Sequence, residues 1–492
     1  MSKHVVIVGA GLGGLSAAIH LRAMGFDVDV YEKNTQVGGR ANRIERDEFR
    51  FDTGPSLINY PWVFEQLFAA AGAALRDYVE LLPLDPSVEF YWRDGSRLQL
   101  GSDFERLAHQ FEQFEPTAHA KLAAFLATNA ERFRFLFDHL VLSNARTIAA
   151  WIGPAPKRPL LRLGLHRSLD AELARFFRSD RIRAALGSYA MYLGGSPYSL
   201  PGTFSILPFG ELYYGLWYPR GGIYALVEAI RRRAEEIGVR IFCKRPVRSI
   251  VVTNGRAQAV QLDDGTTVTA DAIVSNVDVP TTQQMVQGTR PVRRRWTMTP
   301  GVITFYWGIS RVVECLHHHC IFLPDDPRTA YRQLRSRLPE DLPFYVCMPS
   351  RTDSSAAPTG CSTMFVLVPS PTLSGAGNSF DWQRATDRAR NEVLQRLRLH
   401  GVELSPSDIA VEHVWTPLEW QAEFGLYDGS AFGLSHTLWN IGPLRPPNRD
   451  PRIAGLYYVG ASTTPGTGLP MVVLGGKMVA QEVAADARRR VR

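Results

Sequence analysis

The strongest constraint on the fold is an apolar run followed at once by regularly spaced glycines, in VVIVGAGLGGLSAAIHLRAMG at residues 5–25. Residues 5–8 predict a buried strand of a parallel sheet, and Gly9, Gly11 and Gly14 follow with the spacing G-x-G-x-x-G. In such a turn Gly9 makes the sharp bend, Gly11 leaves room for a pyrophosphate, and Gly14 lets the next helix pack on the strand. The helix then directs its free N–H groups and positive dipole end toward the phosphates.

The acid expected beside a ribose follows these glycines. A second strand is predicted over 28–31, and it ends in Glu32, close to the roughly 20-residue separation typical of a carboxylate that binds ribose hydroxyls. Two other interpretations compete: an ordinary βαβ unit with a surface glutamate, and a secretory signal peptide, whose basic start is imitated by Lys3. Because the glycines interrupt the apolar middle that a signal helix needs, the order of elements favours a dinucleotide-binding unit.

Length and composition narrow the class of protein. The 492 residues are enough for about three domains, and the 45% hydrophobic and 21% charged content is typical of a folded soluble protein. No stretch of about 18 residues is apolar enough to span a bilayer. The net charge of +7 suits anionic surfaces such as lipid headgroups but is too dispersed to predict nucleic-acid binding. Five cysteines without a C-x-x-C pair predict no disulfide framework and a reducing, cytoplasmic setting.

A run of cysteines and histidines, ECLHHHC at residues 314–320, raises the question of a metal site. Both residue types are zinc ligands. Consecutive histidines on a strand point to alternate faces, however, and no second cluster completes a tetrahedron. The sequence therefore favours no metal site here, and a surface loop or a strand edge for the histidines.

A second glycine cluster follows the first unit, in YEKNTQVGGRANRI. Gly38 and Gly39 let another backbone segment approach the dinucleotide, and Arg40 can place a charge and a fork of donors beside it. Next comes FRFDTGPSLI, which predicts a strand followed by a turn at Gly54 and Pro55.

The middle of the chain divides by its residue pattern. Residues 60–150 predict mainly helices, whereas 217–278 predict a helix and hairpin strands, with a turn at 264–265. Residues 151–195 are basic and amphipathic, so they suit either a membrane interface or a helix pair packed on the core. The part from 157 to 183 is the candidate membrane contact.

The chain closes as it opens, with a predicted strand over 456–459, Gly460, a small-residue turn and a final helix. We therefore expect both chain ends to share one domain. A dinucleotide domain of this kind, with a second Gly-Gly-Arg cluster, is what a flavin oxidoreductase needs, and a helix N-terminus near 468–471 would stabilise negative charge on the reduced ring.

The expected fold class is α/β, with a Rossmann-like FAD-binding domain built from both chain ends, an inserted α+β substrate domain and a helical, membrane-associated region. The expected boundaries are 1–60, 216–285 and 449–492 for the FAD-binding domain, 61–215 for the helical substrate and membrane-associated region, and 286–448 for the substrate-binding domain.

Several motifs together point to a family. The segments MYLGGSPYSLPGTFSILPF, GLWYPRGGIYALVEAI, PFYVCMPSRTDSSAAPTG and LYYVGASTTPGTGLPMVVLGGK, with the two glycine clusters, resemble the phytoene desaturases of bacterial and fungal carotenoid synthesis. The resemblance spans nearly the whole chain. It implies a fold of the flavin-containing amine oxidase type, non-covalent FAD and lipid polyene substrates at membranes. Two departures, Thr464 and the pair Gly475–Gly476, lie in the flavin-side segment and leave the substrate stage open.

The resemblance also implies which residues hold the cofactor. Residues that would bind the nucleotide are Gly9, Gly11, Gly14, Glu32, Lys33, Gly39, Arg40, Gly54 and Pro55. Val247 would meet the adenine side, and the flavin ring would lie beside Gly460, Gly468, Leu469, Pro470 and Met471.

The implied reaction is the FAD-dependent dehydrogenation of phytoene or a related acyclic carotenoid precursor. Hydride leaves one carbon for the flavin and a proton leaves its neighbour. Glu211 and Glu423 are carboxylates among aromatic residues, where burial would raise the pKa toward the working range of a base, so they are the candidate proton acceptors. A structural role for each carboxylate is the alternative. Because no second nicotinamide motif is visible, a quinone or oxygen is the expected electron acceptor.

Other functions remain open at this stage. The same scaffold suits a C30 dehydrosqualene-type desaturase, a later-stage carotenoid desaturase, a carotenoid terminal-methyl oxidase or an amine oxidase. From a different class, prenyl-lipid escort proteins of related fold bind lipid without redox chemistry. The expected location is cytoplasmic and peripheral on a membrane.

Overall fold

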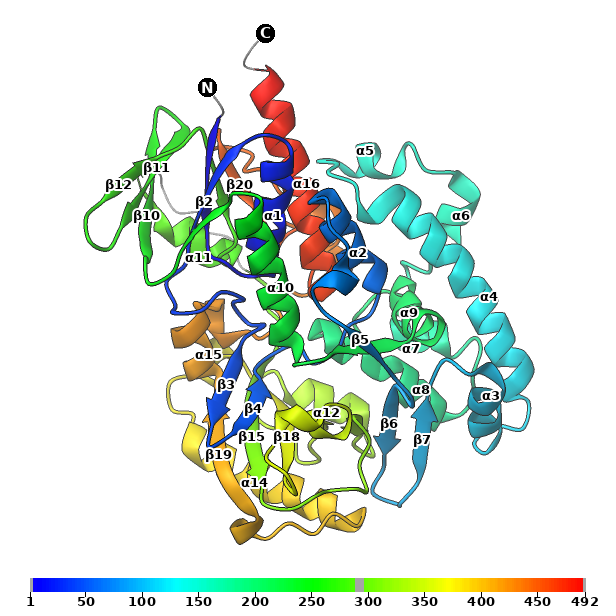
Figure 1. Ribbon diagram of the computed structural model, residues 1–492. Coiled ribbons are helices and arrows are strands. Elements are labelled where there is room, and N and C mark those ends of the chain that lie inside the picture. The colour runs from blue at the N-terminus through cyan, green and yellow to red at the C-terminus, as the bar shows by residue number, and fades with distance from the viewer. Residues whose placement is uncertain (1–2, 288–295, 490–492) are drawn as a thin grey trace.

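A computed structural model describes residues 3–287 and 296–489 of the chain (Figure 1). Residues 1–2 and 490–492 at the ends of the expected FAD-binding domain, and 288–295 in the expected substrate-binding domain, lie outside this description. A five-stranded sheet forms the dinucleotide-binding part, and its neighbouring strands are all parallel. In spatial order the strands are β20 (Leu456–Tyr458), β13 (Ala272–Ser275), β1 (His4–Val8), β2 (Asp27–Tyr31) and β9 (Arg240–Phe242).

The two chain ends meet on this sheet, as the sequence predicts. Helix α1 (Leu12–Ala23) follows β1, and α16 (Leu469–Arg489) follows β20; the two helices pack side by side (Figure 1). The two helices approach closely at Gly476. A Cβ atom on this residue would lie 2.4 Å from the hydroxyl oxygen of Ser16, so a side chain does not fit there. That hydroxyl donates to the carbonyl of Val473 at 2.7 Å. The contact between the helices accounts for Gly476, the second glycine of the departing pair Gly475–Gly476.

A second, smaller sheet flanks the first. Its order is β12 (Thr267–Thr269), β11 (Arg256–Leu262), β10 (Val247–Thr253) and β14 (Val286–Gln287). The predicted turn at 264–265 joins β11 to β12, and Gly265 has a φ of 85°, which favours glycine.

The third sheet forms the opposite part of the molecule (Figure 1). Strand β15, which lies between β19 and β18, is buried along all nine residues, which reflects cover on both faces. The spatial order is β19 (Ile409–Trp415), β15 (Gly301–Ile309), β18 (Ser362–Ser370), β17 (Phe344–Cys347), β16 (His319–Phe322), β6 (Val88–Tyr91) and β7 (Arg97–Leu100).

Two sequence-based expectations are corrected by this sheet. The mainly helical pattern expected over 60–150 missed strands β5 (Leu81–Leu84), β6 and β7. The histidine run was expected in a surface loop or at a strand edge, but β16 lies between β17 and β6, and His318 and His319 are buried. The second error follows from the first, because β16 would end the sheet if β6 and β7 were absent.

Helices fill the remaining space. After α1, the helices that precede β15 in the chain are α2 (Pro61–Ala70), α3 (Phe104–Glu112), α4 (Ala118–Leu136), α5 (Ile148–Ile152), α6 (Lys157–Leu161), α7 (Leu169–Leu173), α8 (Asp180–Gly187), α9 (Ile206–Tyr214), α10 (Ile223–Glu236) and α11 (Val279–Met285). The later helices are α12 (Pro327–Gln333), α13 (Leu373–Ala376), α14 (Trp382–Leu399) and α15 (Pro417–Phe424). Strands β3 (Arg43–Arg46) and β4 (Phe49–Asp52) form a hairpin, and β5 pairs antiparallel with β8 (Leu216–Pro219), which lies far along the chain. Over 3–287 and 296–489, none of the helices combines the length and the apolar character that crossing a bilayer requires.

Candidate active site

One large cavity, of about 560 Å³, joins the dinucleotide-binding sheet to the helical region. Every residue predicted to hold the cofactor lines it except Gly14. These residues are Gly9, Gly11, Glu32, Lys33, Gly39, Arg40, Gly54, Pro55, Val247, Gly460, Gly468, Leu469, Pro470 and Met471. At the far end the wall is made by Phe137, Val141, Ile206 and Leu207. A single cavity therefore connects residues from the glycine motif to an apolar wall on α9 and on the π-helical turn Phe137–Val141 that follows α4.

The glycine turn has the geometry that its sequence predicts. Gly9 has a φ of 93°, where a residue with a side chain would be strained. A Cβ atom on Gly14 would lie 2.3 Å from the carbonyl oxygen of Gly9, so Gly14 serves the packing of α1 on β1. The amide of Gly38 donates to the carbonyl of Ala10 at 2.8 Å, which places the second glycine cluster directly beside the first.

Glu32 lies at the end of β2 and is buried. Its carboxylate accepts hydrogen bonds from the amides of Ala10 at 2.8 Å and Asn34 at 2.9 Å. Burial raises the pKa of Glu32, and the two amide donors oppose this effect. The carboxylate is thus fixed at the rim of the glycine turn, where an acid that recognises ribose is expected.

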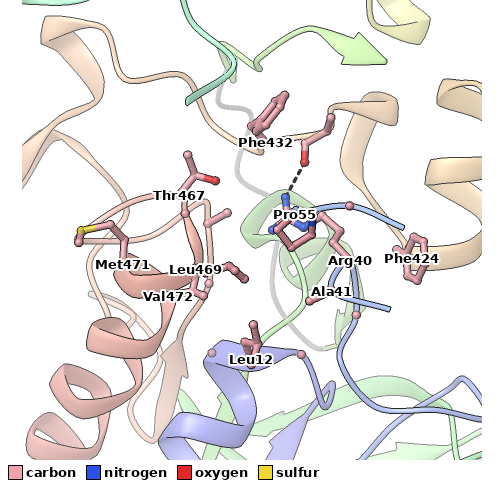
Figure 2. Close-up of a pocket in the computed structure, with 18 of the residues that line it drawn as sticks. Leu12, Arg40, Ala41, Pro55, Phe424, Phe432, Thr467, Leu469, Met471 and Val472 are labelled. Atoms are coloured by element: carbon pink, nitrogen blue, oxygen red, sulfur yellow. Dashed lines mark hydrogen bonds between the residues drawn. The ribbon is translucent and has the colours of Figure 1, made fainter. Parts of the chain in front are cut away.

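Arg40 crosses the cavity from the second glycine cluster. Its Nη1 donates to the carbonyl of Ala431 at 2.8 Å, as Figure 2 shows. Burial lowers the pKa of Arg40, and the charge of Asp278 opposes this effect. Figure 2 also places Pro55 beside Arg40, with Leu469 and Thr467 across the cavity. Asp278 lines the cavity as well, and sequence reasoning missed it because it belongs to no recognised motif.

The loop 460–468 lines the same cavity, and a buried arginine, Arg445, forms hydrogen bonds to the backbone of this loop. Arg445 is 2% exposed, and burial lowers its pKa to about 9. Its guanidinium donates to the carbonyls of Leu434, Ser435, Asn440, Ala461 and Thr463. Asn448 donates to the carbonyl of Thr464 at 3.0 Å. Sequence reasoning missed Arg445, which orders the loop from outside the motif.

The wall opposite the glycines is apolar but carries tyrosines. Tyr60, Tyr189, Tyr192 and Tyr345 line the cavity together with Phe137. Apart from these hydroxyls, this end of the cavity is lined mainly by aliphatic and aromatic side chains. Such a wall suits a hydrocarbon, which has no group for hydrogen bonding.

Glu211 lies behind this wall on α9 and does not line the cavity itself. It is 1% exposed, and its Oε1 accepts a hydrogen bond of 2.5 Å from the hydroxyl of Tyr189. Its Oε2 has no hydrogen-bond partner among the described residues. Burial raises the pKa of Glu211 to about 8. Glu211 is therefore buried among aromatic residues, as the sequence predicts. The hydroxyl of Tyr189, which lines the cavity, links its carboxylate to the cavity by this hydrogen bond.

The same premise fails for Glu423. It is exposed on α15, whereas Trp420 and Phe424 of that helix line the cavity. The reason is helical periodicity, since residues four apart share a face and Glu423 projects elsewhere. Glu423 is therefore dropped as a proton acceptor.

The basic segment 157–183 also divides into two parts. In α7, in α8 and between them, the apolar residues Leu169, Leu173, Phe177 and Ile182 are buried. Three arginines in or beside these helices form ion pairs: Arg167 and Arg175 with the buried carboxylate of Glu172, and Arg183 with Asp180. This part packs on the core. The stretch around α6, with Lys157, Arg158, Leu161 and Arg162, is exposed and has no comparable packing on the core.

Comparisons with known proteins identify a matching family and similar proteins. The family model described as flavin containing amine oxidoreductase matches residues 12–484. A zeta-carotene-forming phytoene desaturase of Myxococcus xanthus is 38% identical over 487 residues, which cover 98% of this chain and 94% of that protein. A 4,4'-diapolycopene oxygenase of Methylomonas sp is 33% identical, with 99% of each chain covered.

A solved structure shares the fold. Wild-type putrescine oxidase bound to putrescine superposes with a TM-score of 0.63 at 17% identity, over 99% of each chain.

Proposed function

Since the chain belongs to the flavin containing amine oxidoreductases, and within them to the carotenoid desaturase family of bacteria and fungi, we propose that it dehydrogenates phytoene or a related acyclic carotenoid precursor with FAD. The observation that carries the proposal is the single cavity that runs from the glycine motif to an apolar wall. A prenyl-lipid escort protein would need the apolar wall alone, not the ordered dinucleotide cradle.

The residues around the cavity fit FAD. Gly9, Gly11 and Gly39 bring bare backbone and the N-terminus of α1 to its edge, where a pyrophosphate would accept hydrogen bonds. There is little room for a side chain in this turn, because a Cβ atom on Gly11 would lie 2.5 Å from Oδ1 of Asn276. Glu32 would bind ribose hydroxyls, and the loop 460–468 with the start of α16 would flank the ring. Bound FAD supplies the hydride acceptor for the reaction.

The chain itself positions the substrate. A polyene held between Phe137, Val141 and Leu207 would be fixed by shape alone, since it makes no hydrogen bonds. Alignment of the reacting carbons in such a channel contributes much of the rate of a dehydrogenation. The proton that leaves the substrate needs an acceptor. Tyr189 lines the cavity, and its hydroxyl donates a hydrogen bond to Glu211. We infer that this pair takes the proton, with Glu211 as the final acceptor.

The test is conversion of phytoene in liposomes by FAD-loaded protein, with a quinone as oxidant, read as new absorption bands in the visible. Oxygen is the second expected acceptor, and turnover that strictly required NAD(P)+ would overturn this part of the proposal. The similarity to a diapolycopene oxygenase makes oxidation of a terminal methyl group the second candidate function. A C30 polyene offered in parallel separates the two, because a methyl oxidase forms an oxygenated product without adding double bonds.

We also propose a peripheral membrane contact at the segment 142–162, beside the far end of the cavity. Val141 lines the cavity, and the next residues along the chain expose Leu142, Ile148 and, at 81%, Leu161. Lys157, Arg158 and Arg162 form no ion pair with described residues and remain open to anionic headgroups. A water-insoluble substrate would then pass from the bilayer into the apolar end of the cavity.

Replacing Leu161 by Glu and both Lys157 and Arg158 by Gln is expected to weaken binding to anionic liposomes roughly 30-fold, since each basic residue near such a surface contributes about 1 kcal/mol. Cosedimentation at low salt measures the effect. The matched control changes Arg384→Gln, Arg398→Gln and Leu399→Glu on α14, which makes the same change in charge and also removes an exposed leucine. Equal binding by the two triple variants would contradict this contact.

A further inference from the structure

A cluster of soft ligand atoms lies beside the cavity and plays no part in the reaction proposed above. His318, His319 and Cys347 each offer one ligand atom, and these three atoms all lie within 4.8 Å of one another. His319 and Cys347 face each other directly across β16 and β17, so their side chains share one face of the sheet. The imidazole rings of His318 and His319 lie 4.4 Å apart between their centroids. All three residues are buried.

The hydrogen bonds of the two histidines leave one nitrogen of each ring unused. Nδ1 of His318 bonds the hydroxyl of Thr352 at 2.6 Å, and Nδ1 of His319 bonds the hydroxyl of Tyr345 at 2.7 Å. Nε2 of each ring is buried and has no partner among the described residues. Buried polar atoms without partners are uncommon in folded proteins and need an explanation. With Nδ1–H donating to the hydroxyl, each Nε2 carries a free lone pair, which is the tautomer that ligates metals.

The surroundings keep both imidazoles neutral. Burial lowers the pKa of His318 to about 3, and the pKa of His319 lies well below its ordinary value for the same reason. The thiolate is the form of cysteine that binds a metal, so a bound cation would take the place of the Cys347 proton. Binding would then release one proton to solvent and leave one thiolate with two neutral imidazoles.

The geometry points to a site for one soft, monovalent metal ion, of which Cu+ is the biological example, held by His318, His319 and Cys347. Thiolate and imidazole are the ligands that such an ion prefers. A monovalent ion with one thiolate gives a neutral centre, which burial tolerates best. Zn2+ would leave a positive charge in the same place and prefers a fourth ligand, which the described residues do not add to this cluster.

Two hydroxyl groups complete the surroundings of the cluster. Thr352 and Tyr345 would hold the two imidazole rings in orientation, as outer partners of metal-bound histidines do. Tyr345 and Ser56 line the cavity, and their oxygens lie 2.6 Å apart. The cavity therefore gives the ion a way to the cluster past Tyr345.

The test is an anaerobic titration of FAD-loaded protein with Cu+ against a chromogenic Cu+ chelator. Every variant carries Cys315→Ser, because Cys315 is an exposed thiol that would bind the ion on its own. We expect one Cu+ per chain, and an affinity at least tenfold lower in Cys347→Ser and in His319→Gln. Cys320→Ser is the matched control: Cys320 is equally buried in β16 but packs in the core on the other face of the sheet, so its loss should leave the affinity unchanged.

A second measurement leaves all three proposed ligands unchanged. X-ray absorption at the copper edge of the protein with only Cys315 replaced should show one sulfur and two nitrogen neighbours. A sulfur-only shell, unchanged affinity in Cys347→Ser, or no Cu+ retained against the chelator would overturn the site. Binding of Zn2+ as tight as that of Cu+ would overturn the assignment to a monovalent ion. Binding that weakens as the pH falls is expected, because protons compete for the thiolate.

Discussion

Arg445→Met should cost the protein its cofactor. The guanidinium is buried and donates to five carbonyl groups, two of which, on Ala461 and Thr463, belong to the loop 460–468. Methionine keeps much of the side-chain volume but leaves these carbonyls without a donor, at a cost of roughly 1–3 kcal/mol for each buried carbonyl left unsatisfied. Because the loop lines the cavity beside the start of α16, we expect the affinity for FAD to fall at least a hundredfold, at about 1.4 kcal/mol per tenfold change.

The control for this variant is Arg396→Met. Arg396 is also fully buried, and it donates to the carbonyl of Leu323 at 2.9 Å, but it lies on α14 against the third sheet. Its replacement should lower the melting temperature without changing the dissociation constant of FAD in the folded protein. Flavin fluorescence during titration measures that constant. Wild-type affinity in Arg445→Met would show that the loop does not depend on the guanidinium.

The second large effect is expected from Glu211→Gln. A positioned proton acceptor contributes roughly 100-fold or more to a rate, so turnover should fall by about this factor. The pKa of about 8 predicts that turnover of the wild type rises with pH up to this value, because only the ionised carboxylate accepts a proton. Glutamine cannot ionise, so the variant should lose this rise. Tyr189→Phe should show the same two changes.

Tyr192→Phe is the matched control for the proton acceptor. Tyr192 lines the same cavity, its ring centroid lies 5.1 Å from that of Tyr189, and its hydroxyl has no hydrogen-bond partner among the described residues. Its replacement should keep the rate and the pH profile. If Glu211→Gln keeps both as well, the proton goes elsewhere and Glu211 is only structural.

The raised pKa of Glu211 also has a consequence for stability. The folded protein holds the carboxyl proton up to a pH of about 8, whereas the unfolded chain loses it near the ordinary value of 4.5. The unfolded state therefore binds fewer protons between these values, and the free energy of unfolding falls as the pH rises through them. Glu211→Gln removes this contribution, and denaturant unfolding at several pH values measures the difference.

The sequence predicted the nucleotide end of the cavity well because its determinants are local. A strand, a turn that needs glycine and a helix follow one another within a few residues, and Glu32 ends the next strand. Backbone geometry alone decides such a unit, so the residue pattern shows it directly.

The residues that sequence reasoning missed act through long-range packing. Arg445 and Asp278 support the loop 460–468 from segments that carry no motif, and Tyr189 and Tyr345 come together only in the folded chain. The misplaced histidines show the same limit, because pairing of β6 with β16 brings together residues more than 200 positions apart and puts the histidines inside the sheet. Local pattern does not report such pairings.

The most direct test of the central claim is to mix FAD-loaded protein with phytoene liposomes in the absence of air and of any other oxidant, and to record the visible spectrum. If the protein transfers hydride from the polyene to its flavin, the oxidised flavin band should bleach while the absorption of a longer conjugated polyene grows in proportion. Addition of a quinone should then restore the flavin band and start further turnover. A flavin band that stays unchanged with phytoene, in protein confirmed to hold FAD and to bind the liposomes, would contradict the claim.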